Sequence, residues 1–345
     1  MMVLEALAPL VLAQATGTGK DWLERAVEAF TRLFPEYSFF NITPNVMGLL
    51  AVVLVSLVCG MVGSLVVGNR MAFFSDALAH CAFAGVALGF LMAYFTGVLG
   101  QTGDFYQWAT PIMVVFGILV GLAIAFVREK TSLASDTVIG VFFAGAMGFG
   151  AMMLQGIGRL GRYFNPEDFL FGSVLTVSSR ELMVLGLLVL LTAPVLALLF
   201  NDLLFTSFNP SLARSRRVRV RLCNYLFIAL LGIIINLCLK TVGALLINAL
   251  LIVPAATACN LCRNLRQMFW TTVLLCLAVS VGGHLLCFYL RFPLEGGTLT
   301  FGSGGGIVVL SVLLFFLSMA VGPLGPRRRA PPAPRAPRAQ AAGVE

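Results

Sequence analysis

The sequence has 345 residues, of which 59% are apolar and 11% are charged, so it has too little polar surface to cover a water-soluble globule. The composition indicates a membrane protein and excludes a soluble catalytic or nucleotide-binding domain. The net charge of +8 does not indicate a nucleic-acid partner, because the basic residues gather in loops beside apolar runs.

Residues 1–45 are predicted to be an N-terminal extension with an amphipathic segment. The apolar stretch 1–13 is followed by Ala-Gln-Ala, which is similar to a signal-peptide cleavage site, but no basic residues precede it and we do not expect cleavage. From 21 to 34 the apolar residues recur at helical spacing, which predicts a helix lying on the membrane lipid surface. The residues predicted to share its apolar face are Trp22, Leu23, Val27, Phe30, Leu33 and Phe34.

Residues 46–322 are predicted to form an all-α, polytopic transmembrane helical bundle with eight or nine spans. A bilayer core about 30 Å thick needs about 20 apolar residues per helical span, and only helices satisfy the backbone polar groups of such runs inside the lipid. The predicted spans are 46–67, 71–95, 109–127, 137–156, 181–204, 222–239, 241–260, 268–290 and 305–322.

Charge predicts the orientation of these spans. Loops rich in Lys and Arg normally face the cytoplasm, which places the basic loop 214–221 inside together with Arg70 and Arg128. The segment before residue 46 then lies outside. Residues 323–345 are Pro-, Ala- and Arg-rich and are predicted to be a disordered cytoplasmic tail.

Asp76 and His80 are the most informative pair, because they are ionisable and lie four residues apart within a predicted span. On a helix both project from one face, within reach of a common ligand. A charged residue inside a span costs about 2.5–3.5 kcal/mol, so it usually has a function. Carboxylate and imidazole suit zinc or manganese. The alternative is that Asp76 caps the helix while His80 bonds a neighbouring helix, and the two residues alone leave both interpretations open.

A second span, 241–260, contains Asn248 and Pro254 in its middle. An amide and a helix-breaking proline inside a span are typical of a helix that lines a pathway or moves. The short run 163–179 is predicted to be a re-entrant or surface helix, because it is too short to span.

Other polar residues favour packing over chemistry. His284 has no acidic neighbour at helical spacing, and we expect it to be a helix contact. Cys259 and Cys262 form a lone C-x-x-C with no second pair to complete a metal site, so we expect them to pack at a helix end. The chain has no P-loop motif and cannot hydrolyse ATP itself. We expect no permanently bound cofactor.

Four stretches in this order, RMAFFSDALAHCAFAGVALGF, TSLASDTVIGVFFAGAMGFG, DFLFGSVLTVSSREL and VGALLINALLIVPAATA, resemble the membrane permeases of metal-ion ATP-binding cassette importers. The resemblance runs from about residue 46 to about 320. It implies an importer-type permease in the bacterial cytoplasmic (inner) membrane that carries zinc, manganese or iron. A second permease copy, cytoplasmic ATPase subunits and an extracytoplasmic solute-binding protein are the implied partners.

The resemblance also assigns roles to residues. It implies that Asp76 and His80 lie on the path of the metal. It places the ATPase-docking loop at Ser211, Leu212, Ala213 and Arg214, a segment that charge alone explains as a positive-inside loop. The chain departs from the family pattern at Ser75, where glycine is usual, at Asn209, where an acidic residue is common, and at His284.

Two other classes of protein compete with this hypothesis. A proton-coupled secondary metal transporter would use the same Asp and His as a relay, but we find no inverted repeat of 71–95 or 241–260. An intramembrane metal-dependent hydrolase would need more ligands than two histidines and one well-placed aspartate offer. Copurification of an ATPase would decide against the secondary transporter, whereas uptake that persists without an ATPase would favour it.

Overall fold

The computed structural model describes residues 22–35, 38–95, 105–131, 133–159, 172, 174–208, 219–294 and 297–321. Nine helices in these ranges are long and apolar enough to cross a membrane, which confirms the predicted number of spans. They are α3 (Thr43–Gly68), α4 (Ala72–Phe95), α5 (Phe105–Lys130), α6 (Ser135–Arg159), α8 (Ser179–Phe208), α10 (Val220–Val242), α11 (Ala244–Leu261), α12 (Leu265–Tyr289) and α13 (Ser303–Val321). The predictions for 1–13, for the docking loop and for the tail 323–345 lie outside the described residues.

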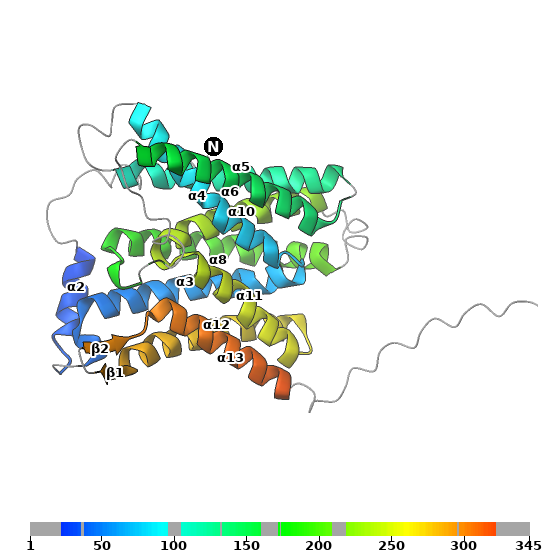
Figure 1. The fold of residues 1–345 in the computed structure, drawn as a ribbon. Coiled ribbons are helices and arrows are strands. Elements are labelled where there is room, and N and C mark those ends of the chain that lie inside the picture. The colour runs from blue at the N-terminus through cyan, green and yellow to red at the C-terminus, as the bar shows by residue number, and fades with distance from the viewer. Residues whose placement is uncertain are drawn as a thin grey trace, which may run out of the picture.

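The spans form one bundle in which α3 and α4 are the most enclosed helices. In Figure 1, α5 and α6 lie along one side and α12 and α13 along the other, with α3, α8, α10 and α11 between them. Of the apolar windows, that of α4 is 78% buried and that of α3 is 67% buried, whereas those of α6 and α13 are only 17% buried. The helix that carries Asp76 and His80 is therefore surrounded by protein along most of its length.

Two sharp backbone turns fix the helices around this region. Arg70 adopts φ 55° in the short turn between α3 and α4, and the Asn69 side chain donates to the Leu65 carbonyl oxygen at 2.9 Å. Gly243 is the single residue between α10 and α11 and adopts φ 83°, a conformation that a residue with a Cβ rarely takes. Gly172, with φ 58°, lies so close that a Cβ there would meet the Gly243 amide nitrogen.

Small residues let these helices approach closely. A Cβ on Gly63 of α3 would lie 2.5 Å from the Leu251 carbonyl oxygen of α11, and a Cβ on Gly60 would lie 2.8 Å from Val273 Cα of α12. On α4, Ala84 packs against Gly150 of α6, where an added Cβ would lie 3.2 Å from the Ala84 backbone. Such contacts are typical of helix packing in membranes, where small side chains allow backbones to meet.

The N-terminal segment forms the predicted helix, but only some of its apolar residues are buried against the protein. Helix α2 (Trp22–Thr31) buries Val27 and Thr31 and packs against α3. Trp22 and Leu33 point outward instead, with exposed fractions of 68% and 79%. Periodicity predicted the helix correctly, but it could not separate the apolar residues that contact protein from those that do not.

The all-α prediction holds for the spans and misses one short hairpin. Strands β1 (Arg291–Leu294) and β2 (Gly297–Thr300) pair antiparallel between α12 and α13. Part of the run predicted as a re-entrant or surface helix, 163–179, falls outside the described residues, and its described end contains a 3₁₀ turn at Val174–Thr176. A Cβ on Gly48 of α3 would meet Val174, so this turn lies against the start of α3.

Candidate functional site

Three polar side chains from two helices meet inside the bundle. The Asn248 Nδ2 of α11 donates a hydrogen bond to Asp76 Oδ1 of α4 at 2.7 Å. The same oxygen lies 3.6 Å from His80 Nε2, one helical turn further along α4. Asp76 and His80, the pair predicted from the i, i+4 spacing, thus have a third polar residue beside them. This residue, Asn248, was predicted only as part of a pathway-lining helix.

The position of Asp76 excludes the helix-cap alternative. Helix α4 begins at Ala72, so Asp76 is its fifth residue and lies beyond the first turn, where a cap acts. Its carboxylate accepts a hydrogen bond from Asn248 of α11. Ser75 is fully buried and donates to the Ala72 carbonyl oxygen at 2.8 Å.

Helix α11 reaches Asp76 because of how it packs on α3. Asn248, Leu251 and Ala255 follow one another at helical spacing and share one face of α11. Gly63 of α3 admits the Leu251 carbonyl on that face and also lies near the Ala255 side chain. Since the turn at Arg70 brings α4 directly after α3, the same face of α11 places Asn248 against Asp76.

Aromatic side chains surround His80 and leave one ring nitrogen without a partner. The imidazole lies edge-on to Phe143 of α6, with ring centroids 5.3 Å apart, and stacks near Phe83 at 6.2 Å. His80 Nδ1 is buried and has no hydrogen-bond partner among the described residues, and the same is true of Asn248 Oδ1. Buried polar atoms normally find partners, so these two atoms mark a polar site within an apolar bundle.

The geometry suits the passage of a divalent ion better than its permanent storage. Ligand atoms lie about 2.0–2.2 Å from a bound zinc ion, so two of them are at most about 4 Å apart, and Asp76 Oδ1 and His80 Nε2 meet this limit at 3.6 Å. Asp76 keeps 45% of its side chain exposed, and His80 keeps 23%. No group of three His, Cys, Asp or Glu side chains able to hold a metal occurs in the described ranges.

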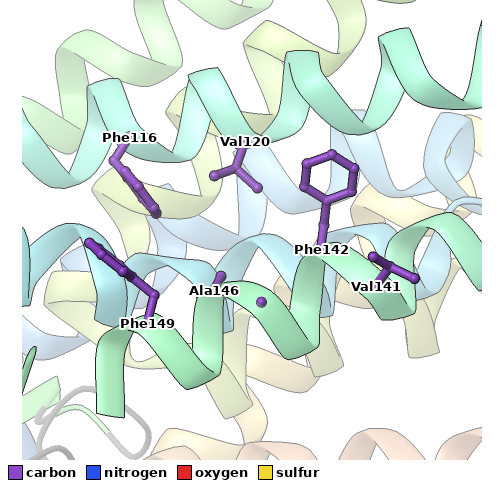
Figure 2. A pocket seen from close by; sticks show the side chains of 7 residues that line it. Phe116, Val120, Val141, Phe142, Ala146 and Phe149 are labelled. Atoms are coloured by element: carbon purple, nitrogen blue, oxygen red, sulfur yellow. The ribbon is translucent and has the colours of Figure 1, made fainter. Parts of the chain in front are cut away.

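A separate hollow between α5 and α6 has a different character. It has a volume of about 340 Å³ and is lined only by apolar residues and glycine. Figure 2 shows Phe116 and Val120 of α5 facing Phe142, Ala146 and Phe149 of α6 across it. Its lining offers no polar side chain to an ion, so the hollow is not part of the candidate site at Asp76, His80 and Asn248.

The remaining predicted residues have mixed outcomes. Pro254 is buried within α11, which continues through it to Leu261. His284 is a helix contact, as predicted: it is 2% exposed, its Nε2 lies 3.4 Å from the Asn45 carbonyl oxygen, and its ring meets Phe39 edge-on. Ser211, Leu212, Ala213 and Arg214 lie outside the described residues.

The C-x-x-C residues occupy the end of α11, as predicted from the lack of a second pair. Cys259 Sγ lies 3.4 Å from Met268 Sδ, and Cys262 Sγ lies 3.2 Å from Thr271 Oγ1. Both contacts reach α12, so the two cysteines join the ends of consecutive helices.

Sequence reasoning missed one ion pair that joins α8 to α10. Lys240 Nζ lies 3.2 Å from Glu181 Oε1, and both side chains are about three-quarters buried. Glu181 also accepts from the Ser178 amide at 3.1 Å, while its own amide donates to Ser178 Oγ at 3.3 Å. These two hydrogen bonds form a capping box, which the spacing S-x-x-E at 178–181 would have predicted. No sequence pattern indicates the ion pair with Lys240.

A model of the family described as "ABC 3 transport family" matches residues 43–322. Among similar curated proteins, the manganese import system permease protein ScaB of Streptococcus parasanguinis is 31% identical over 80% of this chain and 89% of its own length. The high-affinity zinc uptake system membrane protein ZnuB of Haemophilus influenzae is 28% identical over 79% of this chain and 95% of its own.

A solved structure supports the fold. The chain resembles one in the structure titled "PsaBC from Streptococcus pneumoniae in complex with Fab", with a TM-score of 0.63 and 24% identity over 85% of this chain and 95% of that chain.

Proposed function

This chain belongs to the ABC 3 transport family, and we propose that it is the transmembrane permease subunit of an ATP-driven importer of divalent metal ions. It is a multi-pass membrane protein and a transport subunit, not an enzyme, with ATP hydrolysis in a separate component. The relatives named for manganese and zinc support a transition-metal cargo. The proposed cargo is manganese or zinc, with ferrous iron as a further candidate because it shares the same ligand types.

The contact between Asp76, His80 and Asn248 is the observation that carries the proposed path of the ion. It is a polar group of carboxylate, imidazole and amide inside an apolar bundle, where such residues rarely occur without a function. An ion that must leave the site again is served better by few ligands than by a closed tetrahedral shell. Asn248 and Pro254 lie on α11, which we propose as the pathway-lining helix.

We further propose the partners that the family implies. A second copy of this chain would complete the pathway, and Ser211, Leu212, Ala213 and Arg214 would contact a cytoplasmic ATPase. Arg221 Nε of α10 lies 2.6 Å from Glu129 Oε1 of α5, which ties the start of α10 to the end of α5. An extracytoplasmic solute-binding protein would deliver the ion, and the C-terminus would be cytoplasmic, in agreement with the basic residues around Arg221.

Metal uptake in cells that contain the partner subunits tests the proposed site. Replacing both Asp76 and His80 with alanine removes the two charged or ionisable ligands, and we expect uptake of manganese and zinc to fall to background. Asp202→Ala, which removes a carboxylate from α8 instead, is the control and should retain uptake. Unchanged uptake by the double variant at equal expression would refute the role of the two residues.

A further inference from the structure

Asn248 differs from Asn236 and Asn260, two other asparagines in the described spans, because its amide bonds a charged group. Asn236 Nδ2 donates to the Gly232 carbonyl oxygen of its own helix at 2.7 Å. Asn260 lies on the same helix as Asn248 and donates to Ser318 Oγ of α13 at 3.2 Å. The side-chain oxygens of Asn236 and Asn248 are both buried without a partner among the described residues, but of these three asparagines only Asn248 donates to a carboxylate.

This arrangement makes the asparagine a competitor for the ion. The hydrogen bond from Asn248 Nδ2 occupies the Asp76 oxygen that faces His80. A cation that binds between this oxygen and His80 Nε2 would repel the positive end of the Asn248 N–H dipole. Rotation of the terminal amide by half a turn exchanges its nitrogen and oxygen, which presents a carbonyl oxygen to the cation in place of the N–H.

We propose that Asn248 is a switching ligand: its NH₂ group holds Asp76 while the site is empty, and its carbonyl oxygen binds the ion when the site is loaded. The inference rests on the proposed function and deepens it, because it extends the site from two ligands on one helix to three ligands on two. A loaded ion would then bridge α4 and α11. The exchange involves no change in covalent bonds or protons, only a rotation of the amide.

The added ligand has a consequence for selectivity. Amide and carboxylate oxygens suit manganese, whereas imidazole suits zinc. With Asn248 the site offers two oxygen ligands, from Asp76 and Asn248, and one nitrogen ligand, from His80. Without Asn248 it offers one oxygen and one nitrogen. Removal of Asn248 is therefore expected to weaken manganese binding more than zinc binding.

The affinities for Mn²⁺ and Zn²⁺ can be measured by equilibrium dialysis. The purified full-length chain with its ATPase would be reconstituted in lipid nanodiscs for this measurement. Loss of a group that only supports a metal ligand usually weakens binding about 10- to 100-fold. Since Asn248 is here a ligand itself, we expect Asn248→Ala to weaken Mn²⁺ binding by about 10-fold or more and to weaken Zn²⁺ binding less. Asn248→Asp keeps an oxygen and adds a charge, so it should bind Mn²⁺ more tightly than the unmodified chain and release it more slowly, which lowers the transport rate. Asn260→Ala is the control: it removes the hydrogen bond from α11 to Ser318 of α13, which also joins two helices but lies outside the proposed site, and it should leave both affinities unchanged.

The outcomes separate this inference from the proposed function. If Asp76→Ala abolishes binding and uptake while Asn248→Ala binds both ions as the unmodified chain does, the inference is wrong and the proposed site stands. Equal losses in Asn248→Ala and Asn260→Ala would also overturn it, because they would indicate helix packing only. If Asp76→Ala retains both binding and uptake, the proposed site itself fails.

Discussion

Replacing Gly63 with alanine tests whether the packing of α11 on α3 positions the candidate site. The added Cβ would lie 2.5 Å from the Leu251 carbonyl oxygen, about 1 Å inside ordinary van der Waals contact. The obstacle is backbone and cannot rotate away, so α3 and α11 must separate. The hydrogen bond between Asn248 and Asp76 is 2.7 Å long, and a shift of about 1 Å is enough to take it beyond hydrogen-bonding range.

The expected magnitude follows from two opposing effects. Overpacking a well-packed interior costs about 1–3 kcal/mol, whereas alanine stabilises a helix interior by about 0.5–1 kcal/mol relative to glycine. We expect a net loss of about 1–2 kcal/mol in the free energy of unfolding. Gly148→Ala in α6 is the matched control, because nothing lies within 4 Å of its added Cβ, and it should be as stable as the unmodified chain or slightly more stable.

Denaturant titration in mixed micelles, followed by circular dichroism, gives the two unfolding free energies, and metal uptake in cells gives the functional effect. Gly63→Ala should lose both stability and uptake, while Gly148→Ala should lose neither. If Gly63→Ala matches Gly148→Ala in stability, α3 and α11 do not meet as closely as the 2.5 Å contact at Gly63 requires, and their packing does not position Asn248 against Asp76.

Three further predictions concern regions away from the ion site. Lys240→Ala leaves the largely buried carboxylate of Glu181 without its cationic partner and should destabilise the chain by about 1–3 kcal/mol. In the same denaturant titration, the double variant with Lys240→Glu and Glu181→Lys should recover part of that loss, and no recovery would contradict a direct pair. Trp22 should be quenched by brominated lipids in a variant in which it is the only tryptophan, because it points outward from the amphipathic helix α2; absence of quenching would place this helix away from the bilayer. Replacing Cys259 and Cys262 with serine should leave metal uptake unchanged, and a loss of uptake at equal expression would assign them a role beyond joining helix ends.

The spans were predictable because the bilayer imposes a simple rule on them. Twenty or so apolar residues must form a helix wherever they cross lipid, and all nine predicted runs correspond to helices. The hairpin at 291–300 was missed because two four-residue strands lack a repeating pattern long enough to recognise. The difference between the buried Val27 and the exposed Trp22 of α2 was missed, because spacing identifies the apolar residues of a helix but not which of them contact another helix.

The candidate site was predictable only in part. The spacing of Asp76 and His80 identified one face of one helix, and the polarity of Asn248 identified an unusual position on another. No local pattern connects residues that are 172 positions apart. Their contact depends on the tight turn at Arg70 and on the missing side chain at Gly63, which together bring α11 beside the start of α4.

The source of energy for transport tests the central claim most directly. The chain would be reconstituted in proteoliposomes with its ATPase and its solute-binding protein, and accumulation of radioactive manganese and zinc would be measured with ATP, without ATP, and with an imposed proton gradient in the absence of the ATPase. An ATP-driven permease predicts accumulation only when ATP and the ATPase are present, unaffected by a proton ionophore and abolished by replacing Asp76 and His80. Accumulation driven by the proton gradient without the ATPase would contradict the account and favour a proton-coupled secondary transporter.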